Sequence, residues 1–162
     1  MKMVIFDLWG KFAHFRKFYT NSSSLSYSIP PRTTIEGMIG ALLGYERDSY
    51  YKILNSDNLH LAIKKLGKTR KIMQSLNYIK ATSSGELISP KSHTQIPFEL
   101  IAGDENIRYR FYVVHEDEKI MSEIIERISK NRPVYPLCFG RAPFSCYINY
   151  IDEVEYERVK SN

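Results

Sequence analysis

The sequence lacks the residue patterns on which most enzyme classes depend. It contains no G-x-x-x-x-G-K-[ST] or G-x-G-x-x-G phosphate loop, no H-E-x-x-H zinc motif and no G-x-S-x-G nucleophile turn. It has only two cysteines, Cys138 and Cys146, without C-x-x-C spacing, and its four histidines are scattered. Paired carboxylates are missing from its basic regions. We therefore expect no disulfide framework, no metal and no cofactor, and we expect both cysteines to be small buried residues.

Long apolar runs are also absent. No stretch approaches the roughly 20 apolar residues of a membrane helix, and Asp7 interrupts MKMVIFDLWG too early for a signal peptide. We expect a cytoplasmic protein with no membrane partner. The 162 residues, of which 43% are hydrophobic and 25% charged, have the length and composition of a single globular domain over residues 1–162.

Charge is divided unevenly along the chain. Residues 1–98 carry 14 Lys and Arg against 6 Asp and Glu, whereas residues 99–162 carry 9 against 12. Two stretches, Leu8 to Ile35 and Asn58 to Gly85, contain no acid at all. A basic field of this kind attracts a polyanion, most commonly a phosphate backbone, although a solvated basic face is an equal alternative on charge alone.

Hydrophobic periodicity predicts the order of the secondary structure. Strands are expected at Met3–Trp9, Leu59–Leu66, Arg70–Ile79, His93–Ile101, Ile107–His115 and Ser145–Ile151. One helix should begin at a capping box of Thr33 and Glu36 and end at Gly44, and another should cover Asp117–Lys130. This order predicts an α+β domain of the ferredoxin-like βαββαβ class, which is also the arrangement of the RNA-recognition motif. A β-hairpin would be inserted at about residues 68–101, with its turn at Ser83–Gly85.

Side-chain spacing within these elements predicts what they bury. In IRYRFYVVH the alternation places on one face Ile107, Tyr109, Phe111 and Val113. The second helix should face the core with Ile120, Met121, Ile124, Ile125 and Ile128. Its wet side should carry the ion pairs Glu123–Arg127 and Glu126–Lys130. The first helix has a face of small residues that allows close packing, made of Gly37, Gly40, Ala41 and Gly44.

The strongest candidate for an RNA-binding segment lies between Lys11 and Tyr19, where cations alternate with aromatic residues. Aromatic rings can stack on bases while cations meet phosphates. We assign Phe12 and Phe15 to the core. Arg32 beside the predicted helix start marks a site for one phosphate. The basic track would be extended by Lys64, Lys65, Lys68, Arg70 and Lys71.

Metal-free RNA cleavage is a second candidate chemistry. It needs a base at the 2′-hydroxyl and charge stabilisation at the phosphate, which His, Tyr and Lys can supply. The candidates are His93 and Lys91 on the proposed hairpin, with Tyr27 or Tyr45. We favour the alternative that His93 only binds RNA or packs, because residues of these types occur in most chains of this size.

The stretch GKFAHFRKFYTNSSSLSYSIPPRTTIEGMIGALLG resembles the N-terminal signature of the CRISPR-associated Cas-five family. The shared pattern is a first strand, G-x-x-A-x-F-R, a polar loop, S-Y-x-x-P and a helix with G-x-x-G-A-x-x-G. HTQIPFELI and RPVYPLCFGRAPFSCYI are also similar to that family. The resemblance implies a ferredoxin-like domain with a hairpin thumb, acting in antiviral defence as a subunit of a type I Cascade complex. Such a subunit grips the 5′ handle of the crRNA and contacts the Cascade backbone subunit and the large subunit.

Residue by residue, the resemblance implies a handle grip at Lys11, His14, Arg16, Lys17, Tyr27 and Arg32. The thumb would fall at roughly Lys68 to His93, which adds to the RNA-binding set Lys68, Arg70, Lys71 and His93.

One branch of the family is a ribonuclease with a Tyr near the end of the first helix and a Lys-His pair further on. Here Leu43 stands in place of that Tyr, and Ser92 separates Lys91 from His93; Tyr45 lies two residues beyond Leu43. We therefore expect a non-catalytic RNA-binding subunit. The alternatives are a metal-independent endoribonuclease that processes pre-crRNA and a protein-binding scaffold.

Overall fold

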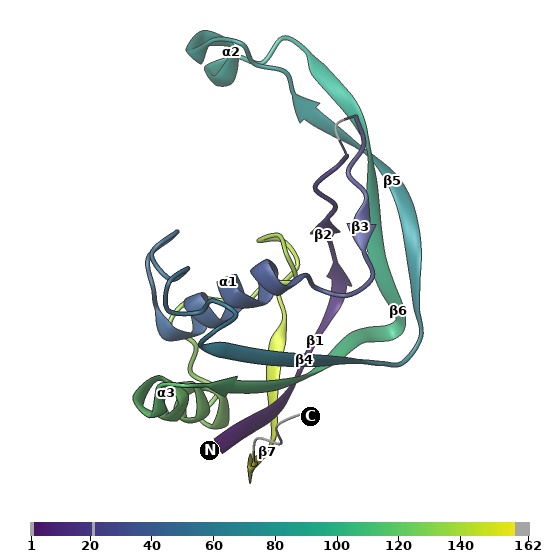
Figure 1. Ribbon diagram of the computed structural model, residues 1–162. Coiled ribbons are helices and arrows are strands. Elements are labelled where there is room, and N and C mark those ends of the chain that lie inside the picture. Colours follow the sequence, from purple (N-terminus) through teal and green to yellow (C-terminus); the bar gives the residue numbers. More distant parts are fainter. Residues whose placement is uncertain (1, 21, 158–162) are drawn as a thin grey trace.

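Five strands form one antiparallel sheet in the computed structural model, which describes residues 2–20 and 22–157 (Figure 1). The strands β4 (Leu59–Leu66), β6 (His93–His115), β1 (Lys2–Ala13) and β7 (Tyr147–Glu155) lie side by side in that order, and β5 (Thr69–Ile79) pairs with β6. Two short strands, β2 (Phe15–Arg16) and β3 (Ser26–Tyr27), pair separately. The helices are α1 (Arg32–Leu43), the short α2 (Ser84–Ile88) and α3 (Glu118–Ser129). The protein is thus a mixed α/β protein with an antiparallel sheet.

The core lies between one face of the sheet and the helices α1 and α3. Alternate residues of β1 are buried there, namely Val4, Phe6 and Leu8. The face predicted for the fifth expected strand is confirmed, because the buried residues of β6 include Ile107, Tyr109, Phe111 and Val113. Helix α3 buries Met121, Ile124 and Ile128, while Ile120 and Ile125 are only partly buried at the margin. The two predicted ion pairs on its wet side are confirmed.

Strand β6 is one element of 23 residues where two strands were expected. Its C-terminal part, from Ile107 onward, pairs with β1 and β4. Its N-terminal part, up to Gly103, pairs with β5 and, at Ile101 and Ala102, with the end of β1. The chain bends between these parts, where a Cβ at Gly103 would lie 2.5 Å from the carbonyl oxygen of Asn106. The expected break is therefore a bend within a continuous strand, and the two separate strands were wrong.

The β5–β6 hairpin, residues 69–103, rises from the sheet and carries α2 at its end (Figure 1). Ser83–Gly85 lie in the connection between the two hairpin strands, as expected, but they begin the short helix α2 and do not form a tight turn. The Ser83 hydroxyl accepts a hydrogen bond from the backbone N–H of Glu86 at 3.4 Å, and the Glu86 carboxylate accepts one from the backbone N–H of Thr82 at 2.6 Å. Reciprocal capping of this kind stabilises a helix start.

Helix α1 begins at Arg32, one residue before the expected start, and its N-cap is Pro31, without a side-chain cap. The predicted capping box of Thr33 and Glu36 is wrong, because the Glu36 carboxylate instead pairs with Arg32 at 2.7 Å. The predicted end at Gly44 is confirmed, since this residue is the C-cap with φ of 81°.

The small-residue face of α1 receives an aromatic ring. A Cβ at Gly40 would lie 2.9 Å from Cδ1 of Tyr50. Of the two phenylalanines assigned to the core, Phe15 is buried but Phe12 is 43% exposed, which makes that assignment wrong. The register of β1 against β6 shifts between Gly10 and Phe12, so strict alternation does not continue through this point.

The ends of several elements differ from expectation. Strand β1 continues past Gly10, and β7 begins and ends later than Ser145–Ile151. Cys146 is buried, whereas Cys138 is only half-buried, and both are free thiols. None of the helices in the described ranges is long and apolar enough to cross a membrane.

Candidate nucleic-acid interface

Two neighbouring hollows share Arg16 in their linings, and together we call them the interface groove. The first has a volume of about 350 Å³ and is lined by Arg16, Phe18, Tyr27, Ile29, Pro31 and Thr33. The second has a volume of about 480 Å³, and its lining includes Arg16, Ser24, Tyr78, Lys80, Thr94 and Arg141. The first hollow lies at the N-terminal end of α1 and the second at the β5–β6 hairpin, with Arg16 lining both. No carboxylate is among the described residues that line it.

Backbone hydrogen bonds hold the polar loop between β2 and β3 against the hairpin. The N–H of Ser24 donates to the carbonyl oxygen of Pro97 at 2.8 Å, and the N–H of Glu99 donates to the carbonyl oxygen of Ser24 at 2.9 Å. Within the β2–β3 ladder, the hydroxyl of Ser26 accepts from the N–H of Phe15 at 2.8 Å. The polar loop is thus anchored as a wall of the groove.

His14 is buried under this loop. Its Nδ1 lies 2.7 Å from the carbonyl oxygen of Glu99, and its Nε2 lies 3.1 Å from the Ser24 hydroxyl. The carbonyl can only accept, so we assign the proton to Nδ1. The ring also stacks on Phe98 with a centroid distance of 4.0 Å. Burial, together with the charges of Arg141 and Arg16, lowers the pKa of His14. His14 was predicted to contact RNA, but its ring is buried and holds the loop in place through these two hydrogen bonds.

Glu99 joins the same cluster from β6. Its carboxylate accepts hydrogen bonds from the N–H of Ser26 at 2.8 Å and from Nζ of Lys71 at 3.0 Å. Burial opposes ionisation of Glu99, but these two donors outweigh it and hold the pKa of Glu99 below its usual range. Lys71, which was predicted to bind RNA, is consequently engaged by Glu99 and by the carbonyl oxygen of Ser26.

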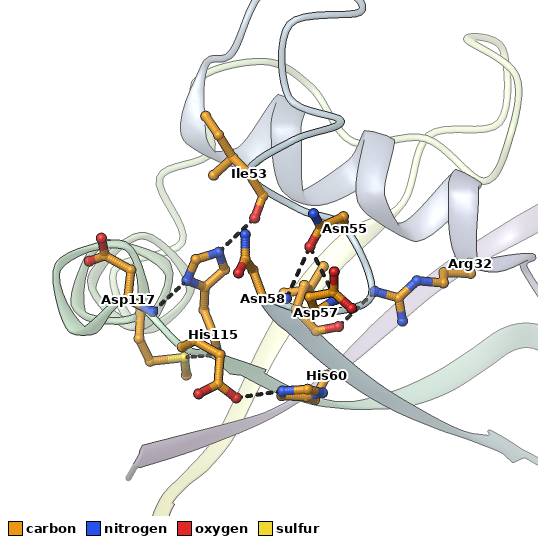
Figure 2. A network of polar contacts seen from close by, with 11 residues as sticks. Arg32, Ile53, Asn55, Asp57, Asn58, His60, His115 and Asp117 are labelled. Atoms are coloured by element: carbon orange, nitrogen blue, oxygen red, sulfur yellow. Dashed lines mark hydrogen bonds and ion pairs between the residues drawn. The ribbon is translucent and has the colours of Figure 1, made fainter.

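Arg32, the first residue of α1, is engaged by partners within the fold. Its guanidinium donates to the carbonyl oxygen of Leu59 at 2.7 Å (Figure 2). It also pairs with the carboxylate of Glu36 at 2.7 Å. The neighbouring polar contacts fix the loop before β4: Asn55 accepts from the N–H of Asn58, and His115 lies 3.0 Å from the carbonyl oxygen of Ile53. The guanidinium predicted to meet a phosphate therefore belongs to the packing of α1 on β4.

Two cations of the predicted set face solvent at the groove. Among residues 2–20 and 22–157, neither Arg16 nor Lys17 has an ion pair. Nζ of Lys17 lies 5.5 Å from the ring centroid of Tyr19 and 5.8 Å from that of Tyr27, and the Tyr19 hydroxyl raises the pKa of Lys17. Phe18 is 87% exposed and meets Tyr19 edge to face. Cations and aromatic rings thus alternate along an open surface.

Arg141 is a groove residue that sequence reasoning missed. Its NH1 donates to the Tyr78 hydroxyl at 2.7 Å, and its guanidinium carbon lies 5.2 Å from the ring centroid of Phe98. Gly140 brings it there: its φ is 87°, and a Cβ on it would lie 2.1 Å from the carbonyl oxygen of His14. The glycine before this arginine was the only local signal, because its partners are distant in sequence.

The remaining predicted RNA contacts lie at separate places. Lys11 is exposed in the irregular part of β1, Lys68 is exposed before β5, and Arg70 makes an exposed pair with Asp104 at 3.4 Å. His93 is exposed near the α2 end of the hairpin, where it pairs with Ile79 in the β5–β6 ladder.

The four residues of the alternative catalytic site are not brought together. Tyr45 follows α1 and lies close to α3: burial and the charges of Glu123 and Asp117 raise its pKa. Lys91 and His93 are on the hairpin. His93 precedes Glu99, which contacts the β2–β3 loop near Tyr27, by six residues or about 20 Å of strand. The described residues also hold no group of three or more His, Cys, Asp or Glu that could bind a metal ion.

The family model described as CRISPR-associated protein (Cas_Cas5) matches residues 3–162. The chain belongs to this family. No curated protein matches this Cas5-family chain in sequence.

Two solved structures have a similar fold. One, titled "CRISPR RNA-guided surveillance complex", aligns with a TM-score of 0.60 and 13% identity, covering 88% of the Cas5-family chain and 59% of its own. The other, titled "Crystal structure of Cas protein", aligns with a TM-score of 0.58 and 12% identity, and the alignment covers 90% of the Cas5-family chain and 62% of the other chain. The Cas5-family chain therefore spans about three-fifths of the length of each.

Proposed function

We propose that this chain is an RNA-binding subunit of a CRISPR effector complex of the Cascade type, and that its interface groove holds the single-stranded 5′ handle of the crRNA. One observation carries the proposal: two hollows that share Arg16 have cations and aromatic rings in their linings and no carboxylate among their described lining residues. Proteins that hold single strands combine a basic track for the backbone with rings on which bases stack.

Each part of the groove has a separate role in this proposal. Phosphates are met by Arg16 and Arg141 in the lining and by Lys17, which lies beside the ring of Tyr27. Bases stack on the exposed rings of Phe18 in the lining and of Tyr19 next to it. Base stacking on an aromatic side chain contributes about 1–3 kcal/mol per base. The N-terminal end of α1, which carries no acid in its first turn, accepts a phosphate at one end of the groove.

The proposal includes the fold class and the partners. The strand order β4-β6-β1-β7, with α1 and α3 between strands, supports a single ferredoxin-like βαββαβ domain with the β5–β6 hairpin as its thumb. Membership of the Cas5 family supports a Cascade backbone subunit and a large subunit as neighbours in the complex.

Electrophoresis over a salt series tests the proposal. The protein is incubated with labelled repeat RNA in EDTA, and native and denaturing gels are run. We expect a shift that weakens steeply with salt, with intact RNA. Each of Arg16→Gln and Lys17→Gln should flatten the slope of log K against log salt by about 0.7, the value for one phosphate contact on a single strand. The matched control is Lys52→Gln, an exposed lysine beyond α1, which should leave the slope unchanged.

Three outcomes would overturn parts of the proposal. An unchanged slope in both groove variants would place the RNA elsewhere. Discrete RNA cleavage that His93→Ala abolishes would indicate the metal-independent ribonuclease. Absence of binding at low salt, both alone and in the assembled complex, would favour the protein-binding scaffold.

A further inference from the structure

The face of the sheet that points away from α1 and α3 carries a second set of cations and rings. Since Val4, Phe6 and Leu8 point into the core, the intervening residues of β1, including Trp9, point to the opposite face. The strand register then aligns one row across four strands: Trp9 is paired with Tyr147 of β7 and with Arg108 of β6, and Arg108 is paired with Leu66 of β4. We call this set the outer row.

Two rings of the outer row form an exposed platform. The ring centroids of Trp9 and Tyr147 are 4.8 Å apart with an interplanar angle of 33°. Tyr147 is nevertheless 55% exposed, and Trp9 is only partly buried. A buried aromatic pair would serve packing, but here most of the tyrosine surface faces solvent. An aromatic surface of this kind can stack on any base, because every base has a π face.

The charges around the outer row favour an anion. Lys64 lies two residues before Leu66 in β4 and therefore on the same face as the outer row. Arg108 and Lys64 are exposed, and neither has an ion pair within the described part of the chain. Asp7, one step further along the same face, is neutralised by Arg110, whose Nε and NH2 donate to the two carboxylate oxygens at 2.8 and 3.1 Å. The exposed charge beside the rings is therefore positive.

We propose that the outer row is a second binding site for single-stranded nucleic acid, separate from the interface groove. Bases stack on Trp9 and Tyr147, and phosphates pair with Arg108 and Lys64. A single strand supplies both a negative backbone and unpaired bases, and it therefore matches both observations at once. The outer row shares no residue with the groove, so its occupancy does not depend on the function proposed for the groove.

The chain offers a direct probe of this site, because Trp9 is its only tryptophan. Short oligouridine is titrated into the full chain while tryptophan fluorescence is excited selectively. We expect saturable quenching as a base stacks on the indole. Arg108→Gln and Lys64→Gln should each flatten the salt slope of this quenching by about 0.7. Tyr147→Ala should weaken the affinity measured by quenching by about fivefold to 150-fold, which is the equivalent of one stacked base. Tyr147→Phe keeps the ring and should leave this affinity nearly unchanged.

Two further experiments distinguish the outer row from the interface groove and RNA from DNA. Arg16→Gln should leave the quenching of Trp9 intact while it weakens the gel shift of repeat RNA. Oligodeoxythymidine titrated in parallel shows whether the site prefers DNA or RNA, and tighter binding of either supports a single-strand site. The proposal is overturned if the folded protein shows no saturable quenching. It is equally overturned if quenching is lost in Arg16→Gln and retained in Arg108→Gln.

Discussion

Replacing Glu99 by Gln tests how much the cluster beneath the β2–β3 loop stabilises the fold. Gln keeps an acceptor for the N–H of Ser26 but removes the charge. A hydrogen bond to a charged acceptor contributes about 1.5–3 kcal/mol and a neutral one about 1 kcal/mol, so about 1 kcal/mol is lost there. The pair with Lys71 adds only about 0.5–1 kcal/mol, because the Lys71 side chain is 38% exposed and that of Glu99 is 12% exposed.

The free energy of unfolding should therefore fall by about 1.5–2 kcal/mol in Glu99→Gln at neutral pH, which corresponds to about 3–8 °C in Tm for a domain of this size. Urea unfolding measures it, with Glu105→Gln, an exposed carboxylate in the bend of β6, as the matched control. The folded pKa of Glu99 lies below its unfolded value of 4.5, so its contribution is present above pH 4.5 and is lost as the pH falls through the folded pKa. A deficit that is absent at neutral pH, or that persists undiminished in acid, would refute this reasoning.

Three further predictions concern single residues. Gly140→Ala should destabilise the protein by at least about 1–3 kcal/mol through backbone strain and its clash with His14, whereas Gly85→Ala, which meets open space, should cost nothing in thermal unfolding. Because the folded pKa of His14 lies below the unfolded value of 6.5, the unfolded chain binds the proton first. The stability advantage of the wild type over His14→Asn should therefore shrink as the pH falls below 6.5, and a constant advantage in urea titrations would contradict this. Phe18→Ala should weaken RNA binding by about fivefold to 150-fold without changing Tm, since this ring is almost wholly exposed; a lowered Tm would instead indicate a packing role.

Elements whose determinants are local could be predicted from the sequence. The buried face of β6 follows from strict alternation, and the ion pairs of α3 follow from i,i+4 spacing. Helix α1 ends where Gly44 permits a positive φ. In each case the residues that decide the structure lie within one turn or one strand of one another.

Predictions failed where a residue had a choice of partners. The Glu36 carboxylate could form a capping box with Thr33 or pair with the guanidinium of Arg32, and in the folded chain it pairs with Arg32. Phe12 and Phe15 looked equivalent in sequence, but the register shift after Gly10 leaves Phe12 partly in solvent. Neither outcome follows from local spacing, because strand pairing and packing decide between alternatives that are locally similar.

The candidate site shows the same limit. The sequence located the cations but not their partners: His14 and Lys71 both meet Glu99, which is 85 and 28 residues away from them. The cations facing the groove can therefore be separated from those within the fold only by knowing the long-range contacts. Arg141 was missed for the same reason, since its aromatic partners come from the β5–β6 hairpin.

Photo-crosslinking tests the central claim most directly. Repeat RNA whose handle uridines are replaced by 4-thiouridine is bound to the chain and irradiated, and crosslinked peptides are identified by mass spectrometry after trypsin digestion. Cleavage after Lys17 and Arg32 releases residues 18–32, a peptide that contains Phe18, Tyr19 and Tyr27. If the groove holds the handle, this peptide carries the main crosslink. In the double variant Arg16→Gln and Lys17→Gln, which lacks the cleavage sites after residues 16 and 17, trypsin releases residues 12–32 instead, and that peptide should carry less crosslink. Crosslinks confined to residues 46–57, on the loop beyond α1, would contradict the proposed path of the RNA.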